Sequence, residues 1–228
     1  MKRMPFSVVL FLVLAPMRVS SQVAIGTEAW VMPQEAALTY QRNVVQPLLD
    51  QAISDPTLPA GIKRRVQTLF FREIMGQRIL YEAKPFYHPE TRDMLAHVDF
   101  SIPADKPILM VFIPAIRDME REYQIRRLPE SALQIVLAIA FAHEMAHVEL
   151  MAKYPIRERV RLPNAVITQL EESEAWAITI LEMIRPALAQ DRWLPDNYRQ
   201  NSEEFRKAGD NYARPEWLRN FSGHPSYR

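Results

Sequence analysis

Two histidines flank a glutamate within the apolar run AFAHEMAHVELM, residues 140–151. His143 and His147 are four positions apart, so on an α-helix their imidazoles lie on one face and can reach a single ion. Glu144 lies one step round that helix, where its carboxylate can take a proton from a metal-bound water and return it to a leaving amine. Zinc suits this chemistry because it lowers the pKa of its bound water towards neutrality. The residues therefore predict a catalytic metal centre on a helix.

The surrounding sequence favours a metal over two ordinary core histidines, which is the simpler alternative. The run SALQIVLAIAFAHEMAHVELMA is apolar on nearly all sides, as is typical of a helix at the centre of a fold. Burying His-Glu-His there without partners would cost several kcal/mol, which a bound metal would offset. In a chain with 5 histidines, the pattern H-E-x-x-H of zinc metallopeptidases arises by chance with a probability on the order of 1%.

A catalytic zinc needs a third protein ligand and keeps one position for water. The chain has no cysteine, so this ligand is expected to be His, Asp or Glu. The segment AVITQLEESEAWAITILEMI, residues 165–184, carries Glu171, Glu172 and Glu174. Glu174 falls in the apolar stripe of a helix over this segment, whereas Glu172 shares a face with small residues that let two helices approach closely. The helical pattern leaves the choice among the three glutamates open.

The two segments together resemble the gluzincin group of metallopeptidases, the thermolysin-like clan. In several of its branches, including the membrane-bound CAAX-processing-like proteases, the second helix carries E-x-x-A-D, often as E-x-E-A-D. The segment Glu172–Trp176, ESEAW, fits that frame except at its last position. The resemblance covers roughly residues 130–186 and implies that Glu172 is the third ligand of one Zn²⁺. Trp176 stands where the family has an aspartate that supports a ligand histidine.

The resemblance also implies a substrate-binding strand and a side chain that stabilises an oxyanion. PILMVFIP, residues 107–114, is in the right place for a strand whose edge holds extended substrate, although an ordinary core strand fits equally well. His88 and His97 are expected to be ordinary surface or core histidines. The sequence does not rank the candidates for the oxyanion stabiliser, which are Tyr154, Tyr198, Tyr212 and His224.

The elements that position these residues alternate between helical and strand patterns. Apolar spacing predicts helices over residues 33–54, 58–76, 129–153 and 163–184. Pro47 is expected to end or kink the first helix, and Arg185-Pro186 to stop the last. Segments rich in β-branched and aromatic residues predict a small antiparallel sheet, with strands over 78–83, 95–102 and 107–114. The C-terminal region from about 187 is polar, with a short helix expected at 200–208. The order predicts an α+β, zincin-like fold.

The N-terminus predicts export. Met1-Lys2-Arg3 is basic, residues 6–15 are apolar and small residues follow, which is the layout of a signal peptide over residues 1–21. Cleavage is expected after Ser21, with Ala24 as the alternative, and the apolar part is too short to span a bilayer comfortably. Residues 22–228 are then one zincin-like domain. The absence of cysteine favours a secreted or periplasmic protein of a bacterial kind.

Charge excludes some partners. The net charge of the whole chain is +1, and the first 21 residues hold three basic side chains and no acid, so the remainder is slightly acidic. A nucleic-acid or anionic-membrane partner would need a clustered basic surface, and neither is expected. We expect an exported zinc peptidase that acts on a peptide or protein substrate and has no stable membrane span after signal removal. The alternative is a non-catalytic metal-binding or interaction protein on a zincin scaffold. The sequence does not indicate the oligomeric state.

Overall fold

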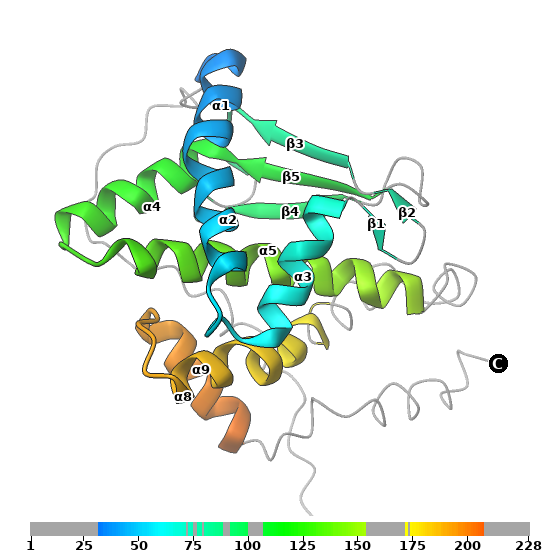
Figure 1. Cartoon of the computed structure of the whole chain (residues 1–228), viewed down its shortest axis with the longest axis vertical. Helices are drawn as coiled ribbons and strands as arrows, with labels where there is room; N and C mark the ends of the chain where they lie inside the picture. Colours follow the sequence, from blue (N-terminus) through cyan, green and yellow to red (C-terminus); the bar gives the residue numbers. More distant parts are fainter. Residues whose placement is uncertain are drawn as a thin grey trace, which may run out of the picture.

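The computed structural model describes residues 32–71, 73–74, 77–78, 80–88, 92–99, 107–153, 172 and 174–207. Within these ranges the chain forms helices, then a small sheet, then more helices, which confirms the predicted α+β class (Figure 1). Several predictions lie outside the described residues. These are the signal peptide over residues 1–21, Glu171 and the first part of its helix, and the candidates Tyr154, Tyr212 and His224.

The first predicted helix is present, but Pro47 does not end it. The α-helix α1 (Gln34–Tyr40) passes into a π-helical turn, η1 (Gln41–Val45), and then into α2 (Gln46–Ser54). Pro47 therefore lies in the first turn of α2. A proline ring has no N–H and clashes with the carbonyl four residues earlier, and the wider π-turn gives that ring room. The second predicted helix, α3 (Ala60–Phe71), is shorter than the expected 58–76.

The sheet has three strands in the order β3-β5-β4 and is mixed. β4 (Ala96–Asp99) runs antiparallel to β5 (Ile108–Phe112), as predicted, but β3 (Leu80–Lys84) runs parallel to β5. The antiparallel expectation is wrong for β3. β5 lies between β3 and β4, which run in opposite directions, so it can be antiparallel to only one of them. β5 is the central strand, so residues 107–114 do not supply a free edge for substrate. A short hairpin of β1 (Glu73–Ile74) and β2 (Gln77–Arg78) stands apart from this sheet.

A helix that the sequence analysis did not predict follows the sheet directly. α4 (Ile113–Ile125) begins at the end of β5 and carries Pro114 in its first turn, where a missing N–H costs nothing. The helix packs against α1 and α5. The hydroxyl of Tyr40 on α1 donates a hydrogen bond to the carboxylate of Glu120 on α4. This hydrogen bond joins α1 to α4, the helix that follows the sheet.

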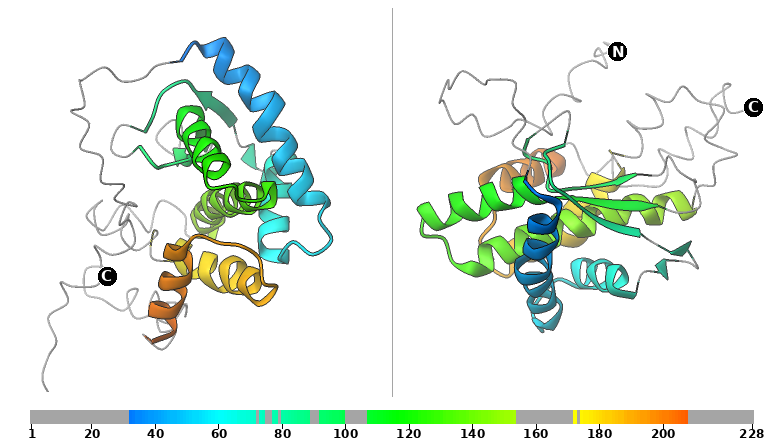
Figure 2. Two further views of the ribbon diagram at one scale, coloured as in Figure 1. Left: turned by 90° about the vertical axis from the view of Figure 1, so that its left-hand side faces the viewer. Right: turned by 90° about the horizontal axis from the view of Figure 1, so that it is seen from above.

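The central element is α5 (Glu130–Lys153), whose bounds match the predicted helix over 129–153. It crosses the molecule between the sheet on one side and the C-terminal helices on the other (Figures 1 and 2). It packs against β4, α2, α3 and α4. In the described part of the chain, its stretch Glu130–Leu150 is the one helix long and apolar enough to cross a membrane, and 78% of the tested stretch is buried inside the protein. Such burial is typical of a core helix.

The glutamate-bearing helix continues further than predicted. Glu172 and residues 174–179 are helical and lead into a π-helical turn, η2 (Ile180–Ile184), and then into α8 (Arg185–Ala189). The stop expected at Arg185-Pro186 is therefore wrong. As at Pro47, a π-turn precedes the proline and the helix continues. The final described helix, α9 (Asp196–Lys207), begins earlier than the expected 200–208.

Candidate metal centre

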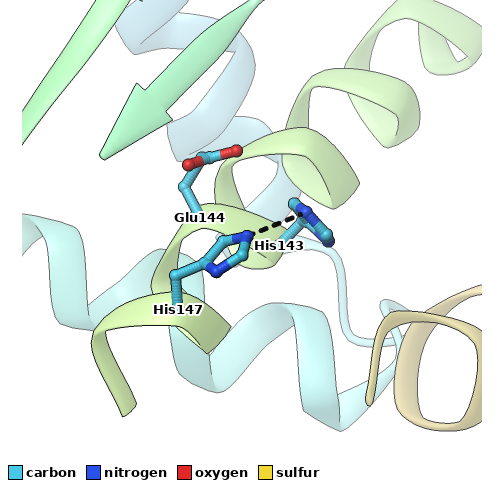
Figure 3. Close-up of side chains that lie close together, drawn as sticks. All are labelled: His143, Glu144 and His147. Atoms are coloured by element: carbon cyan, nitrogen blue, oxygen red, sulfur yellow. Dashed lines mark hydrogen bonds between the residues drawn. The ribbon is translucent and has the colours of Figure 1, made fainter. Parts of the chain in front are cut away.

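His143, Glu144 and His147 project from the middle of α5 (Figure 3). His143 and Glu144 are buried, each only 8% exposed, and His147 is partly buried. Each of the three offers one ligand atom, and these atoms lie within 4.8 Å of one another. The three side chains therefore form a group that could hold a metal ion.

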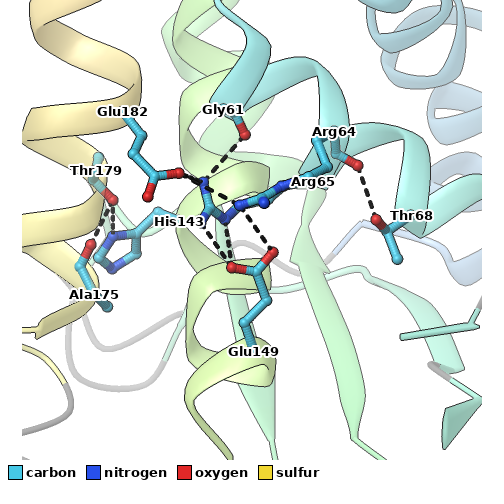
Figure 4. A network of polar contacts seen from close by, with 9 residues as sticks. All are labelled: Gly61, Arg64, Arg65, Thr68, His143, Glu149, Ala175, Thr179 and Glu182. Carbon is cyan, nitrogen blue, oxygen red and sulfur yellow. Dashed lines mark hydrogen bonds and ion pairs between the residues drawn. The ribbon is translucent and has the colours of Figure 1, made fainter. Parts of the chain in front are cut away.

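The hydrogen bonds of His143 fix where its ring carries a hydrogen. The hydroxyl of Thr179 donates to the backbone oxygen of Ala175 at 2.8 Å, and Nδ1 of His143 lies 2.9 Å from the same hydroxyl oxygen (Figure 4). Because the hydroxyl hydrogen is already used, Nδ1–H must be the donor in the second bond. In the neutral ring Nε2 is then a bare acceptor, which is the form that binds a metal. Thr179 thus does for His143 what an aspartate would do.

Glu172 completes a triangle of donor atoms with the two imidazoles. Nε2 of His143 lies 3.3 Å from Nε2 of His147, and the Glu172 carboxylate lies 3.5 Å from the former and 3.2 Å from the latter. Tetrahedral zinc with ligand bonds of about 2.0–2.1 Å holds neighbouring ligand atoms roughly 3.3–3.4 Å apart. The 3.5 Å distance runs to Oε1 of Glu172 and the 3.2 Å distance to Oε2, so the three side chains bring their donor atoms to about the spacing that one zinc ion requires.

The electrostatics of Glu172 also favour a cation. Partial burial raises its pKa, but the hydrogen bonds and positive charge of His143 and His147 outweigh that effect and hold the pKa far below its usual range. Glu172 therefore stays ionised. When the ring of His143 carries a proton on both nitrogens, Nε2 can donate to Oε1 of Glu172 at 3.5 Å; in the neutral ring with its hydrogen on Nδ1, the bare Nε2 faces that oxygen acceptor to acceptor. Such a pair is stabilised either by a second proton on the ring or by a metal ion.

Trp176 supports the same glutamate. Its indole N–H donates to Oε1 of Glu172 at 2.8 Å, and its ring packs against the ring of His143 with centroids 4.7 Å apart. Trp176 therefore contacts two of the candidate ligands, Glu172 and His143. Each of these two candidate ligands thus has a supporting contact, since Thr179 bonds His143 and Trp176 bonds Glu172.

Glu144 points to the sheet rather than to the neighbouring helix. One of its carboxylate oxygens accepts the backbone N–H of Val98 in β4 at 2.8 Å. Burial raises the pKa of Glu144 to about 7, against the lowering effects of His147 and of the Val98 N–H. A carboxyl with a pKa close to neutral can both accept and release a proton at ordinary pH, as a general base must.

The pairing register shows which groups of β4 face outward. Phe112 donates its N–H to the oxygen of Leu95, so these two form a hydrogen-bonded pair of the antiparallel ladder. Pairs alternate along such a ladder, so Ala96 and Val98 direct their backbone N–H and C=O groups away from β5. The Val98 N–H reaches Glu144 in that way. Among the described residues, β4 pairs only with β5, so its outer side is an edge of the sheet, and Val98 on that edge contacts Glu144.

The other predicted residues fall in different places. Tyr198 on α9 packs against Trp176 with ring centroids 6.5 Å apart, and burial raises its pKa to about 12. It therefore borders the side chains that surround the donors. Glu174 is helical and partly exposed. His88 packs edge-on against His97 and Phe112. Within the described residues, the group of His143, Glu144 and His147 includes neither of these two histidines.

Sequence reasoning missed two contributors to this site. It counted Thr179 only as a small residue on the face of Glu172, although its spacing of seven from Glu172 and its hydroxyl marked it as a polar partner. Nothing in the sequence indicated that the backbone of Val98 would hold Glu144. No protein-family model, curated protein or solved structure matches this chain, so the likeness to gluzincins rests on the motif residues and their geometry alone.

Proposed function

We propose that this chain is an exported, zinc-dependent peptidase of gluzincin type, with His143, His147 and Glu172 as ligands of one Zn²⁺. The observation that carries the proposal is the convergence of the three donor groups at 3.2–3.5 Å beside the carboxylate of Glu144. Bound zinc would supply a water of lowered pKa and polarise the scissile carbonyl. The motif likeness and the supporting contacts of Thr179 and Trp176 agree with this assignment.

Glu144 is the proton carrier in this proposal. Its carboxylate takes a proton from the attacking water and delivers it to the leaving amine, while the Val98 N–H holds one of its oxygens. The rest of the outward edge of β4, the N–H and C=O of Ala96 and the C=O of Val98, would pair with an extended peptide as an added strand. The substrate class is therefore an extended peptide or an unfolded protein segment.

Export remains a proposal that rests on the N-terminal sequence. A basic start, an apolar segment over residues 6–15 and small residues at the expected cleavage site support it. N-terminal sequencing of the protein secreted by a bacterial host tests it directly. We expect the mature chain to begin at Gln22.

Glu144→Gln tests the chemistry. We expect the variant to keep its zinc and to lose at least about 100-fold in the hydrolysis of a set of internally quenched peptides, because the amide cannot accept a proton. Glu130→Gln, on the same helix but exposed in its first turn, is the matched control and should be fully active. Zinc binding without hydrolysis in the wild type would instead support the non-catalytic metal-binding protein.

A further inference from the structure

Arg65 is a buried charge outside the candidate metal centre. It projects from α3 and is 1% exposed, which places it among the largest fully buried side chains in the described part of the chain. A guanidinium does not lose its charge at any ordinary pH, so its burial requires partners. Those partners come from the two helices that carry the candidate metal ligands (Figure 4).

The guanidinium makes four hydrogen bonds. Nε and Nη2 donate to Oε2 of Glu149 at 3.0 and 2.7 Å. Nη1 donates to Oε2 of Glu182 at 2.8 Å and to the backbone oxygen of Gly61 at 3.2 Å. One planar group thus joins a carboxylate on α5 to a carboxylate on η2. The fixed fork of an arginine can make such a bridge, whereas the single ammonium of a lysine cannot hold both partners in the same geometry.

Both partners lie close in sequence to the candidate site. Glu149 follows His147 by two positions on α5, and Glu182 follows Thr179 by three positions in the helix that carries Glu172. Gly61 brings α3 against that second helix, since a Cβ at this position would meet the backbone oxygen of Glu182 at 2.5 Å. α3 therefore sets the separation of the two helices through a backbone contact and a bridging charge.

We propose that Arg65 is a positioning residue of the metal centre. By joining Glu149 to Glu182, it holds the helix of His143 and His147 at the distance from the helix of Glu172 at which their donor atoms lie 3.2–3.5 Å apart. A buried ion pair contributes little net stability, but it can select one arrangement of helices over others. The inference rests on the proposed function, since it concerns the affinity of the same donors for zinc.

Zinc affinity measured by competition with a chromophoric chelator tests the inference. We expect Arg65→Lys to weaken zinc binding about tenfold, in line with the loss of a supporting group around a metal site. Glu182→Ala should have a similar effect, and it keeps the Cβ that contacts Gly61. Arg64→Gln is the matched control, because Arg64 contacts the same two glutamates from an exposed position and should change the affinity by less than about threefold.

The outcomes separate a positioning role from a merely structural one. The inference is overturned if Arg65→Lys and Glu182→Ala unfold at a lower temperature but bind zinc as tightly as the wild type. That result would leave the proposed function intact. A wild type that binds no zinc overturns both. If Arg65→Lys fails to fold, Glu182→Ala decides the question alone, since its side chain is half-exposed and its loss leaves Arg65 bonded to Glu149.

Discussion

Two polar clusters join α5 to the helix of Glu172, and they differ in how their charges are satisfied. In the guanidinium cluster of Arg65, Glu149 and Glu182, each contact of Arg65 runs from a donor to an acceptor. In the imidazole cluster of His143, His147 and Glu172, the bare Nε2 of His143 faces a carboxylate oxygen. The first cluster is complete as it stands, whereas the second is complete only with a further proton or a cation.

The difference distinguishes a buried charge that stabilises the fold from a group of buried polar side chains that favours a bound cation. A core tolerates a guanidinium such as that of Arg65, which makes four hydrogen bonds to oxygens, because the pairing offsets most of the desolvation cost. The bare Nε2 of His143 and the carboxylate oxygen of Glu172 are both acceptors 3.5 Å apart, and a positive charge between them would remove their repulsion. The imidazole cluster is therefore the place to expect a ligand, and the guanidinium cluster is the place to expect a fixed support.

The largest expected effect contrasts one residue from each cluster. His147→Ala should lose more zinc affinity than the roughly 10–100-fold typical of an outer supporting residue, because it removes a ligand. Glu149→Ala, two positions along the same helix, should keep one zinc per chain, although it binds the metal less tightly. Its unfolding free energy should fall by only about 2 kcal/mol, because the buried charge of Arg65 keeps its bond to Glu182. Elemental mass spectrometry and urea unfolding measure the two quantities. Equal loss of zinc in both variants would contradict the distinction.

Thr179→Val tests whether the tautomer of His143 matters. The change keeps the size of the side chain and removes the acceptor for Nδ1–H, so we expect zinc affinity to fall about 10–100-fold. Thr68→Val is the matched control, because the Thr68 hydroxyl bonds the carbonyl of Arg64, four residues earlier, in the same way, and it lies on α3, which carries none of the three proposed ligands. Chelator competition on both variants gives the comparison. A similar affinity for the two would show that Thr179 does not orient the ring.

Trp176→Phe should have a smaller effect. Phenylalanine keeps an aromatic ring against His143 but removes the indole N–H that Glu172 accepts. One hydrogen bond to a half-exposed carboxylate is worth about 1 kcal/mol, so zinc affinity should fall about fivefold. Isothermal titration with zinc in competition with a chelator resolves such a change. An unchanged affinity would mean that Glu172 needs no help from Trp176.

A third polar cluster, remote in sequence from α5, supplies the smallest predicted effect and concerns stability alone. Partial burial raises the pKa of Asp55, but hydrogen bonds from Thr57 and Arg192 outweigh it and lower the pKa to about 2. A lowered folded-state pKa stabilises the protein above about pH 4, and this contribution disappears as pH falls to about 2. Because the pair is partly exposed, the contribution is about 1 kcal/mol.

Asp55→Asn should remove that part of the acid dependence. Its unfolding free energy, measured by urea between pH 5 and 2, should fall less steeply than that of the wild type and converge with it at the acid end. Zinc content at neutral pH should not change. Parallel curves for the two proteins would show that Asp55 does not titrate in this way.

The sequence was sufficient for the helix that carries the motif. The apolar run from Glu130 is bounded by Pro129 and Pro155, and its length excludes a strand, so its bounds were predicted within a residue or two. The α+β class followed from the order of patterns. The parallel pairing of β3 with β5 could not be read from sequence, since local composition does not say which strand inserts between two others.

The prolines illustrate a second limit. Pro47 and Pro186 are each preceded by a π-turn that lets the helix continue, so the usual rule that proline ends a helix failed at both positions. The helix α4 was missed because Pro114 looks like the end of a strand and is in fact in the first turn of a helix.

Within the site, sequence alone left three glutamates as candidates, and the family resemblance selected Glu172. The Glu172 carboxylate lies 3.5 and 3.2 Å from the Nε2 atoms of the two histidines, whereas amphipathicity would have favoured Glu174. Arg65 could not have been found by pattern, because its neighbour Arg64 has the same charge and only the fold makes one buried and the other exposed.

Elemental mass spectrometry of the wild type, Glu172→Ala and Glu174→Ala would show whether Glu172 is the third ligand of one zinc ion. The two glutamates lie two positions apart on one helix, so each variant is a control for the other. We expect one zinc per chain in the wild type and in Glu174→Ala, and none in Glu172→Ala. No zinc in the wild type after reconstitution, or zinc retained in Glu172→Ala and lost in Glu174→Ala, would contradict this expectation.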